Sequence, residues 1–239
     1  MSGLGRPRVH HRTVDSTNER AKALAGSGAP HGTLATAGEQ TAGRGRQGRT
    51  WAGLPGTAVL MSMIVRGLEE RHALLPLTTA VAVCEAAEAC ARVRCAIKWP
   101  NDVWIDGRKL AGILVEARPQ EGWAVIGVGI NVTTTTEDFP AELGGGATSL
   151  AIEAPADGQV SVDAVLAALL ETLAARLQQD QDRILDEWRS RDALRGRQIA
   201  WTGGEGTAAG VDPSGALLVE TSAGMVALEA GEVHLQVDA

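Results

Sequence analysis

Three arginines, Arg44, Arg46 and Arg49, lie close together in a glycine-rich segment, where they could bind an anion. A guanidinium group presents paired N–H donors that match a nucleotide phosphate or a substrate carboxylate. The cluster is unusual in this chain, because the formal net charge is −7 and the protein has no general attraction for nucleic acid. The alternative is a solvated basic loop without a ligand. The cluster therefore indicates a local anion site in an acidic protein.

The segment from Gly43 to Gly48 has the glycine spacing of a dinucleotide-binding loop, but its surroundings do not fit that fold. A dinucleotide loop leads into a helix whose N-terminus holds the pyrophosphate. Here Gly53, Pro55 and Gly56 disfavour a helix. A Walker loop is excluded too, because the sequence contains no Gly-Lys-Ser or Gly-Lys-Thr triplet. We expect a flexible loop that presents its arginines to a ligand.

A second group of polar residues surrounds a predicted β-hairpin. Asp106 and Gly107 form a strong two-residue turn signal, and such a turn brings the residues on its two sides together. Asn101, Asp102 and Lys109 are therefore expected to share a site. Taken singly, the lysine is explained equally well as a surface residue and the Asn-Asp pair as a simple turn. Their occurrence together with the arginine loop favours a functional site.

The elements that must position these residues follow from hydrophobic periodicity and turn signals. Ser16 and Glu19 have the spacing of a capping box at the start of a helix. Strands are expected at 33–39, 57–65, 96–99, 103–105, 110–116 and 123–132. Helices are expected from the turn at 14 to 25, at 72–92, and from a Ser161 N-cap to about 188, the last as core packing. The pattern predicts an α+β domain, a mixed sheet packed by helices at one side.

After residue 197, short β segments alternate with turns at 203–204, 212–215 and 223–224. This spacing is typical of a small β-barrel. We therefore expect a catalytic domain at 1–192 and a small C-terminal barrel at 193–239.

The composition places the chain in the cytoplasm. The N-terminal residues 1–12 are polar and basic, unlike a secretory signal, and we find no apolar run long enough to span a membrane. Cys84, Cys90 and Cys95 are interpreted as reduced thiols in the core. The five histidines show no metal-ligand spacing.

Five motifs, in this order and spacing, resemble the signature of biotin protein ligases. They lie at residues 15–18 (DSTN), 40–49 (QTAGRGRQGR), 98–102 (KWPND), 109–114 (KLAGIL) and 127–131 (GVGIN). The likeness runs from about residue 9 to 237. It implies a class II synthetase-like catalytic domain followed by an SH3-like barrel. It also implies an ATP-dependent ligase that forms biotinyl-5′-AMP, releases pyrophosphate, and transfers biotin to a lysine of a carrier protein.

The resemblance assigns roles to individual positions. The implied biotin-binding residues are Ser16, Thr17, Asn18, Gln40, Arg44, Gly45, Arg46, Lys109, Gly112 and Gly129. The implied ATP-binding residues are Arg46, Arg49, Trp51, Asn101, Asp102, Lys109 and Asn131. Lys109, Arg44 and Arg46 are expected to be catalytic, and Asp102 is the candidate ligand for Mg²⁺. Trp51 is expected either to stack on adenine or to anchor the core.

The implied substrates are biotin and ATP with Mg²⁺, and the implied partner is the biotin carboxyl carrier domain of a biotin-dependent carboxylase. A monomer or weak homodimer is expected, with no DNA or membrane partner. The nearest alternative is a lipoate or octanoyl protein ligase, which shares the fold. A biotin-sensing repressor would need an N-terminal helix-turn-helix, for which the sequence leaves no room before Ser16. A non-enzymatic anion-binding module would leave the barrel and the lysine hairpin unexplained.

Overall fold

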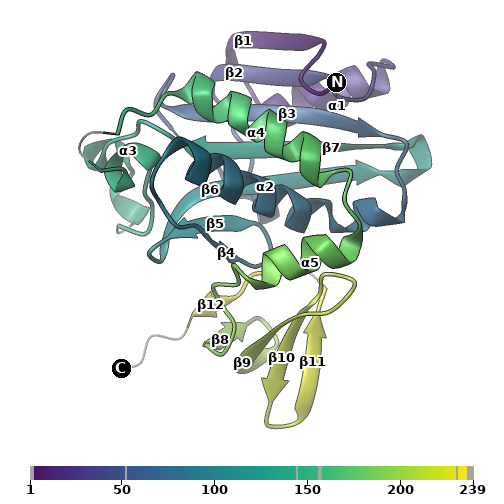
Figure 1. Cartoon of the computed structure of the whole chain (residues 1–239), viewed down its shortest axis with the longest axis vertical. Coiled ribbons are helices and arrows are strands. Elements are labelled where there is room, and N and C mark those ends of the chain that lie inside the picture. Colours follow the sequence, from purple (N-terminus) through teal and green to yellow (C-terminus); the bar gives the residue numbers. More distant parts are fainter. Residues whose placement is uncertain (1–2, 52, 144, 156–157, 230, 236–239) are drawn as a thin grey trace.

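The computed structural model describes residues 3–51, 53–143, 145–155, 158–229 and 231–235. Its larger part is a seven-stranded sheet of order β1-β2-β3-β7-β6-β5-β4, flanked by helices (Figure 1). Strands β1 and β2 run parallel, and the other neighbouring pairs are antiparallel, so the sheet is mixed, as expected. The strands are β1 (Arg8–Val14), β2 (Leu34–Gln40), β3 (Ala58–Arg66), β4 (Ala96–Lys98), β5 (Asp102–Ile105), β6 (Arg108–Arg118) and β7 (Trp123–Asn131).

Strand β1 is the one strand of this sheet that the sequence did not predict. It lies at the sheet edge, paired only with β2, and most of its side chains are exposed. An exposed edge strand has no buried face to impose an alternating apolar pattern. The remaining strands lie where the periodicity placed them, and Asp106 and Gly107 have the positive φ angles of the predicted hairpin turn.

Helices cover both faces of this sheet, so the expectation that they lie at one side was wrong. Met61, Met63 and Val65 of β3 pack in the core with α2 (Leu75–Cys90) and α4 (Val162–Arg176). Ile64, between them, packs instead with α1 (Thr17–Gly26). Because successive strand residues face opposite sides, α1 lies on the other face of the sheet. That second face carries the site described below.

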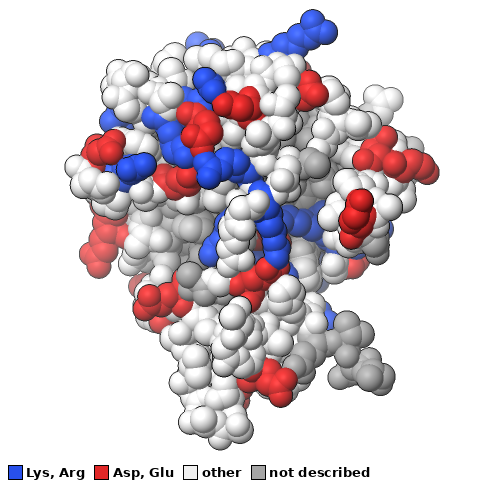
Figure 2. Space-filling view, turned by 180° about the vertical axis from the view of Figure 1, so that it is seen from behind, with Lys and Arg blue, Asp and Glu red and all other residues white. Residues whose placement is uncertain are grey.

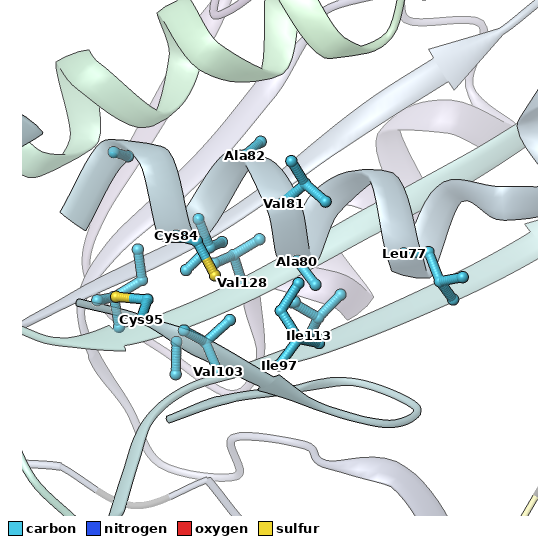
Figure 3. Packing of buried hydrophobic residues seen from close by; sticks show 14 of the residues in the cluster. Leu77, Ala80, Val81, Ala82, Cys84, Cys95, Ile97, Val103, Ile113 and Val128 are labelled. Atoms are coloured by element: carbon cyan, nitrogen blue, oxygen red, sulfur yellow. The ribbon is translucent and has the colours of Figure 1, made fainter. Parts of the chain in front are cut away.

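Helix α2 is the central core helix. Its small side chains, Ala80 and Cys84 among them, let it approach the sheet near Ile97 and Val128 (Figure 3). Residues 70–90, which add the 3₁₀ turn η2 (Glu70–Leu74), form the one helical stretch of the described residues long and apolar enough to cross a membrane. Its most apolar window is 67% buried inside the fold. Core packing therefore explains its composition.

The helix expected from 161 to 188 is in fact two helices. Ser161 caps α4, accepting a hydrogen bond from Ala164 N, but α4 ends at Arg176. The chain then turns, and Asp180 caps α5 (Gln181–Arg189) by accepting a hydrogen bond from Arg183 N. The break lets α5 run toward the second sheet (Figure 1). Short elements that were not predicted are α3 (Leu150–Glu153), η1 (Arg46–Gly48), η3 (Pro119–Glu121), η4 (Thr136–Asp138) and η5 (Ala141–Leu143).

The second sheet has five antiparallel strands in the order β11-β10-β9-β8-β12. These are β8 (Gln198–Trp201), β9 (Gly204–Val211), β10 (Leu217–Thr221), β11 (Gly224–Leu228) and β12 (His234–Leu235). The three predicted turns join its first four strands. This small all-β unit agrees with the SH3-like barrel that was expected, while the boundary between 192 and 193 stays a prediction.

Candidate active site

A cavity of about 280 Å³ opens on the face of the large sheet that carries α1. Its floor is formed by β6 and β7, and the arginine loop, residues 43–51, forms one wall. The KWPND segment and residues 231–233, which precede β12, complete the lining. Figure 2 views this side of the molecule and shows Lys and Arg side chains gathered across its middle, with Asp and Glu beside them.

Three glycines of β6 and β7 leave space above the sheet, because they carry no side chain. Gly112 of β6 and Gly129 of β7 are direct partners across the sheet. A Cβ on Gly112 would lie 2.9 Å from Trp51, and one on Gly129 would lie 2.5 Å from the same indole. The ring of Trp51 therefore lies against this glycine pair. The expected approach of a ligand's bicyclic ring at these glycines stays a prediction.

Gly127, the third glycine, makes room for Asn18. A Cβ at Gly127 would stand 2.0 Å from the Asn18 side-chain oxygen. Asn18 Nδ2 donates to Glu116 Oε2 at 2.9 Å, and its Oδ1 lies 2.6 Å from Ser62 Oγ. Since Asn18 and Ser62 are both buried, this network fixes their donors and acceptors in place.

The polar end of the cavity continues at the start of α1. Thr17 donates from its backbone N and from Oγ1 to Gln40 Oε1, at 2.7 and 3.1 Å. Ser16 has the extended backbone of an N-cap, but its side chain makes no capping hydrogen bond. Glu19 likewise pairs with Lys22 and Arg44 and does not close a capping box. The capping-box interpretation was therefore wrong, and the Ser16 side chain lines the cavity.

The cationic end of the cavity combines the arginine loop with the hairpin. Lys109 Nζ lies 2.7 Å from Asp102 Oδ1 and 5.8 Å from the centre of the Trp51 ring. Arg44 pairs with Glu19. Arg46 lies in the lining without a direct acidic partner among the described residues, and burial lowers its pKa from the ordinary value. Positive charge is thus concentrated beside a neutral polar recess.

The structure gathers nearly all of the predicted site residues into this one cavity. The lining includes Ser16, Thr17, Asn18, Gln40, Arg44, Gly45, Arg46, Arg49, Trp51, Asn101, Asp102, Lys109, Gly112 and Gly129. The exception is Asn131, which does not line it. Asn131 is buried and donates from Nδ2 to the Thr148 carbonyl at 3.0 Å. Asn101 lines the cavity but also donates from Nδ2 to the Ile113 carbonyl at 2.9 Å.

Several lining or supporting residues had not been assigned a role from sequence. Lys98 lies over the Trp104 ring at 5.1 Å, and burial lowers the pKa of its amino group. Ser62 is the one polar residue in the apolar run of β3, which was an available signal. Glu232 reaches the cavity from the second sheet and had no comparable signal.

The comparison with protein families agrees with this geometry. The model of the biotin/lipoate A/B protein ligase family matches residues 10–132, and that of the biotin protein ligase C terminal domain matches residues 195–235. The first range spans all five motifs. The second covers the five-stranded sheet.

Similar proteins and structures carry related names. The bifunctional ligase/repressor BirA of Bacillus subtilis is 35% identical over 97% of this chain and 75% of its own length. The biotin–[acetyl-CoA-carboxylase] ligase of Mycobacterium tuberculosis is 34% identical over 92% of this chain and 86% of its own. A biotin protein ligase from Aquifex aeolicus in complex with biotin and ATP superposes with a TM-score of 0.83, at 28% identity, over 98% of this chain and 100% of that one.

Proposed function

This chain belongs to the biotin/lipoate A/B protein ligase family, and we propose that it activates biotin with ATP and then joins biotin to a lysine of a carrier protein. One observation carries this proposal. A fixed neutral polar recess and a group of cations occupy the same cavity. Biotin has a neutral ureido ring at one end and a carboxylate at the other, so it matches both halves.

The polar recess supports binding of the ureido ring. A ureido group presents two N–H donors and one carbonyl acceptor, and it needs partners in fixed positions. Ser62 Oγ lies within hydrogen-bond distance of both Thr17 Oγ1 and Asn18 Oδ1, and Gln40 anchors the turn into α1. Ser16 adds a hydroxyl that the helix does not use. Such a preorganised set binds a polar ligand without being reordered first.

The cations support the first chemical step. An oxygen of the biotin carboxylate attacks the α-phosphate of ATP, the bond to the β-phosphate oxygen breaks, and pyrophosphate leaves with that bonding pair. Two anions must approach each other, so their repulsion must be offset by fixed positive charge. Lys109, Arg44 and Arg46 supply this charge in our proposal. Asp102 holds Lys109 in place through their ion pair.

We assign nucleotide binding to the arginine loop, the KWPND segment and the hairpin, so Arg46 and Lys109 contact both substrates. In this proposal the ATP phosphates lie beside four cations of the cavity lining: Arg46, Arg49, Lys109 and Lys98. Lys98 had not been assigned a role from the sequence. Trp51 offers an indole face for adenine, and Asn131 remains a candidate from the resemblance alone. Asp102 and Asn101 carry the oxygens that would hold the magnesium brought with ATP. Magnesium is commonly bound by one or two carboxylates together with substrate phosphates and waters, and it neutralises phosphate charge there.

The second step transfers biotin to the carrier. The amino group of a carrier lysine attacks the acyl carbon of biotinyl-5′-AMP, an amide forms, and AMP leaves. No nucleophile of this chain is required. Relatives named as ligases for acetyl-CoA carboxylase support a biotin carboxyl carrier domain as the acceptor. Free thiols at Cys84, Cys90 and Cys95 support a reducing compartment, the cytoplasm.

The transfer of biotin is tested with a purified biotin carboxyl carrier domain, ATP and Mg²⁺. Intact-mass spectrometry should show the addition of one biotin, lost when the target lysine of the carrier is replaced by arginine. A parallel reaction supplies lipoate in place of biotin. Modification with lipoate and not with biotin would refute the proposed specificity.

A further inference from the structure

An ion pair joins the arginine loop to the second sheet. Arg49 ends the turn formed by η1, and its guanidinium group contacts the Glu232 carboxylate, 183 positions further along the chain. The Glu232 side chain is 25% exposed and the Arg49 side chain 58%, so only the carboxylate side of the pair is shielded from solvent. This pair is one of the places where the second sheet reaches the cavity.

Hydrogen bonds attach the second sheet to the large sheet. The indole Nε1 of the buried Trp99 donates to the Gly215 carbonyl at 3.0 Å. Backbone hydrogen bonds also join Ile97 to the segment leading into β8. Ile97 N donates to Arg191 O at 2.7 Å, and Ala193 N donates to Ile97 O at 2.9 Å. Glu232, which lies just before β12, therefore belongs to a unit that is bonded to the KWPND segment and to β4.

Fixing Arg49 also fixes the part of the loop that faces the cavity. Gly45 N donates to Arg49 O at 2.7 Å, and Arg49 N donates to Arg46 O at 3.1 Å. These bonds close a compact turn that holds Arg46 in the cavity lining. On its other side the loop is joined to α1 by the ion pair of Arg44 with Glu19. The loop is thus attached at both ends, once to each sheet domain.

We infer that Glu232 is a positioning residue, which holds the arginine loop closed over the acyl-adenylate through Arg49. This inference rests on the proposed function, because it concerns the intermediate of that reaction. A mixed anhydride of biotin and AMP reacts with any accessible amine and with water, so its retention requires a closed site. The ion pair of Arg49 with Glu232, both in the cavity lining, supplies this closure by joining the loop to the C-terminal unit. Its loss should increase the escape of the intermediate more than it slows the formation of that intermediate.

The decisive variant is Glu232→Gln, which keeps the shape and removes the charge. The protein is incubated with ATP, Mg²⁺ and biotin, and serum albumin is added as an acceptor unrelated to the carrier. Biotin on albumin, divided by pyrophosphate released, measures escape. We expect this ratio to rise roughly two- to five-fold, the range that corresponds to partly exposed ion pairs. Glu232→Asp, which restores the charge, should recover part of the retention.

Two controls separate positioning from a merely structural role. Glu220→Gln removes the same charge from β10 of the same C-terminal unit, where Glu220 is exposed and no ion pair is found for it among the described residues, and it should leave the ratio unchanged. Trypsin should also cut the arginine loop faster in Glu232→Gln than in either the parent or Glu220→Gln. Far-ultraviolet circular dichroism and the unfolding midpoint verify that each variant is folded.

A salt titration of the unmodified protein tests the pair without any substitution. Escape should rise more steeply with ionic strength in the parent protein than in Glu232→Gln, because salt screens both ion pairs of the loop in the parent and only the Arg44–Glu19 pair in the variant. Equal escape and equal trypsin sensitivity in Glu232→Gln and the parent would overturn the inference. Absence of biotin-dependent pyrophosphate release in the parent would instead refute the proposed function. The two failures are therefore distinguishable.

Discussion

At the scale of single residues, the cavity is divided between neutral groups that fix geometry and cations that lower repulsion. Ser62 contacts both Thr17 and Asn18 at hydrogen-bond distance and all three are buried, so they hold one arrangement. Lys109 stands at the other end, paired with Asp102 and beside Trp51. The proposed chemistry depends on both ends being present in one volume.

Replacement of Lys109 by alanine should slow adenylate formation by two orders of magnitude or more. The lysine would lie between two approaching anions, and removal of one preorganised contact of this kind costs about 2.7–4 kcal/mol in the transition state. The rate of biotin-dependent pyrophosphate release measures the effect. Arg183→Ala, which removes an exposed cation from α5 outside the cavity lining, is the control. Near-normal release by the Lys109 variant would contradict its assignment.

ATP binding should weaken at alkaline pH because Lys98 loses its charge. Burial lowers the pKa of Lys98, so its charge is lost at a lower pH than that of an ordinary lysine. As the pH rises through this lowered value, the cavity loses a cation and the KM for ATP should increase. Lys98→Arg keeps its charge over the same range and should flatten this rise. An unchanged alkaline limb in Lys98→Arg would show that another group is responsible.

Sequence reasoning identified most of the cavity residues because their types and spacing carry chemical meaning. Arg44, Arg46 and Lys109 could be named without a structure. The fine roles could not be derived in this way, because they depend on contacts across the sheet. Gly129 illustrates this: its lack of a Cβ leaves room for Trp51, which comes from a loop far away in sequence.

At the scale of elements, the hairpin of β5 and β6 is the part that the sequence predicted best. Its turn is encoded locally by Asp106 and Gly107, and both have the expected backbone. The break between α4 and α5 was missed because Leu177 and Ile184 are seven residues apart, a spacing that also fits one continuous helix, although the six residues between them are polar. The signal that was available is local, because Asp180 in this polar stretch is the N-cap of α5. Strand β1 was missed because it has no buried face.

The cap at Asp180 should account for much of the stability of α5. Asp180 accepts a hydrogen bond from Arg183 N at 2.9 Å. Asp180→Ala should lower the free energy of unfolding by about 1 kcal/mol, within the range for lost N-caps. The unfolding midpoint should fall by about 2–4 °C in a chain of this size. Asp180→Asn keeps a capping side chain and should remain near the parent value; an equal loss in both variants would argue against capping.

At the scale of the whole molecule, the two sheets cooperate in one site. Trp99 belongs to the KWPND motif, yet its indole N–H is used to join the second sheet through Gly215. Glu232 comes back from that sheet to the arginine loop. Local pattern could predict each domain, but it could not predict this junction, because the contacting residues lie more than a hundred positions apart.

Trp99→Phe should loosen this junction. The change removes one part-buried hydrogen bond, worth about 0.5–1.5 kcal/mol, and some packing volume. Hydrogen exchange monitored by mass spectrometry should show faster exchange in β8 to β10 than in the parent, with smaller changes in β3 and β7. Uniformly faster exchange across both sheets would indicate general destabilisation and would contradict a specific role at the junction.

The central claim is that one cavity of this chain activates biotin before any carrier is present. The most direct measurement is the exchange of labelled pyrophosphate into ATP, with Mg²⁺, in the absence of a carrier protein. We predict exchange that requires biotin, that lipoate does not support, and that Lys109→Ala loses. Exchange without biotin, exchange supported by lipoate, or no exchange until a carrier is added would contradict the account.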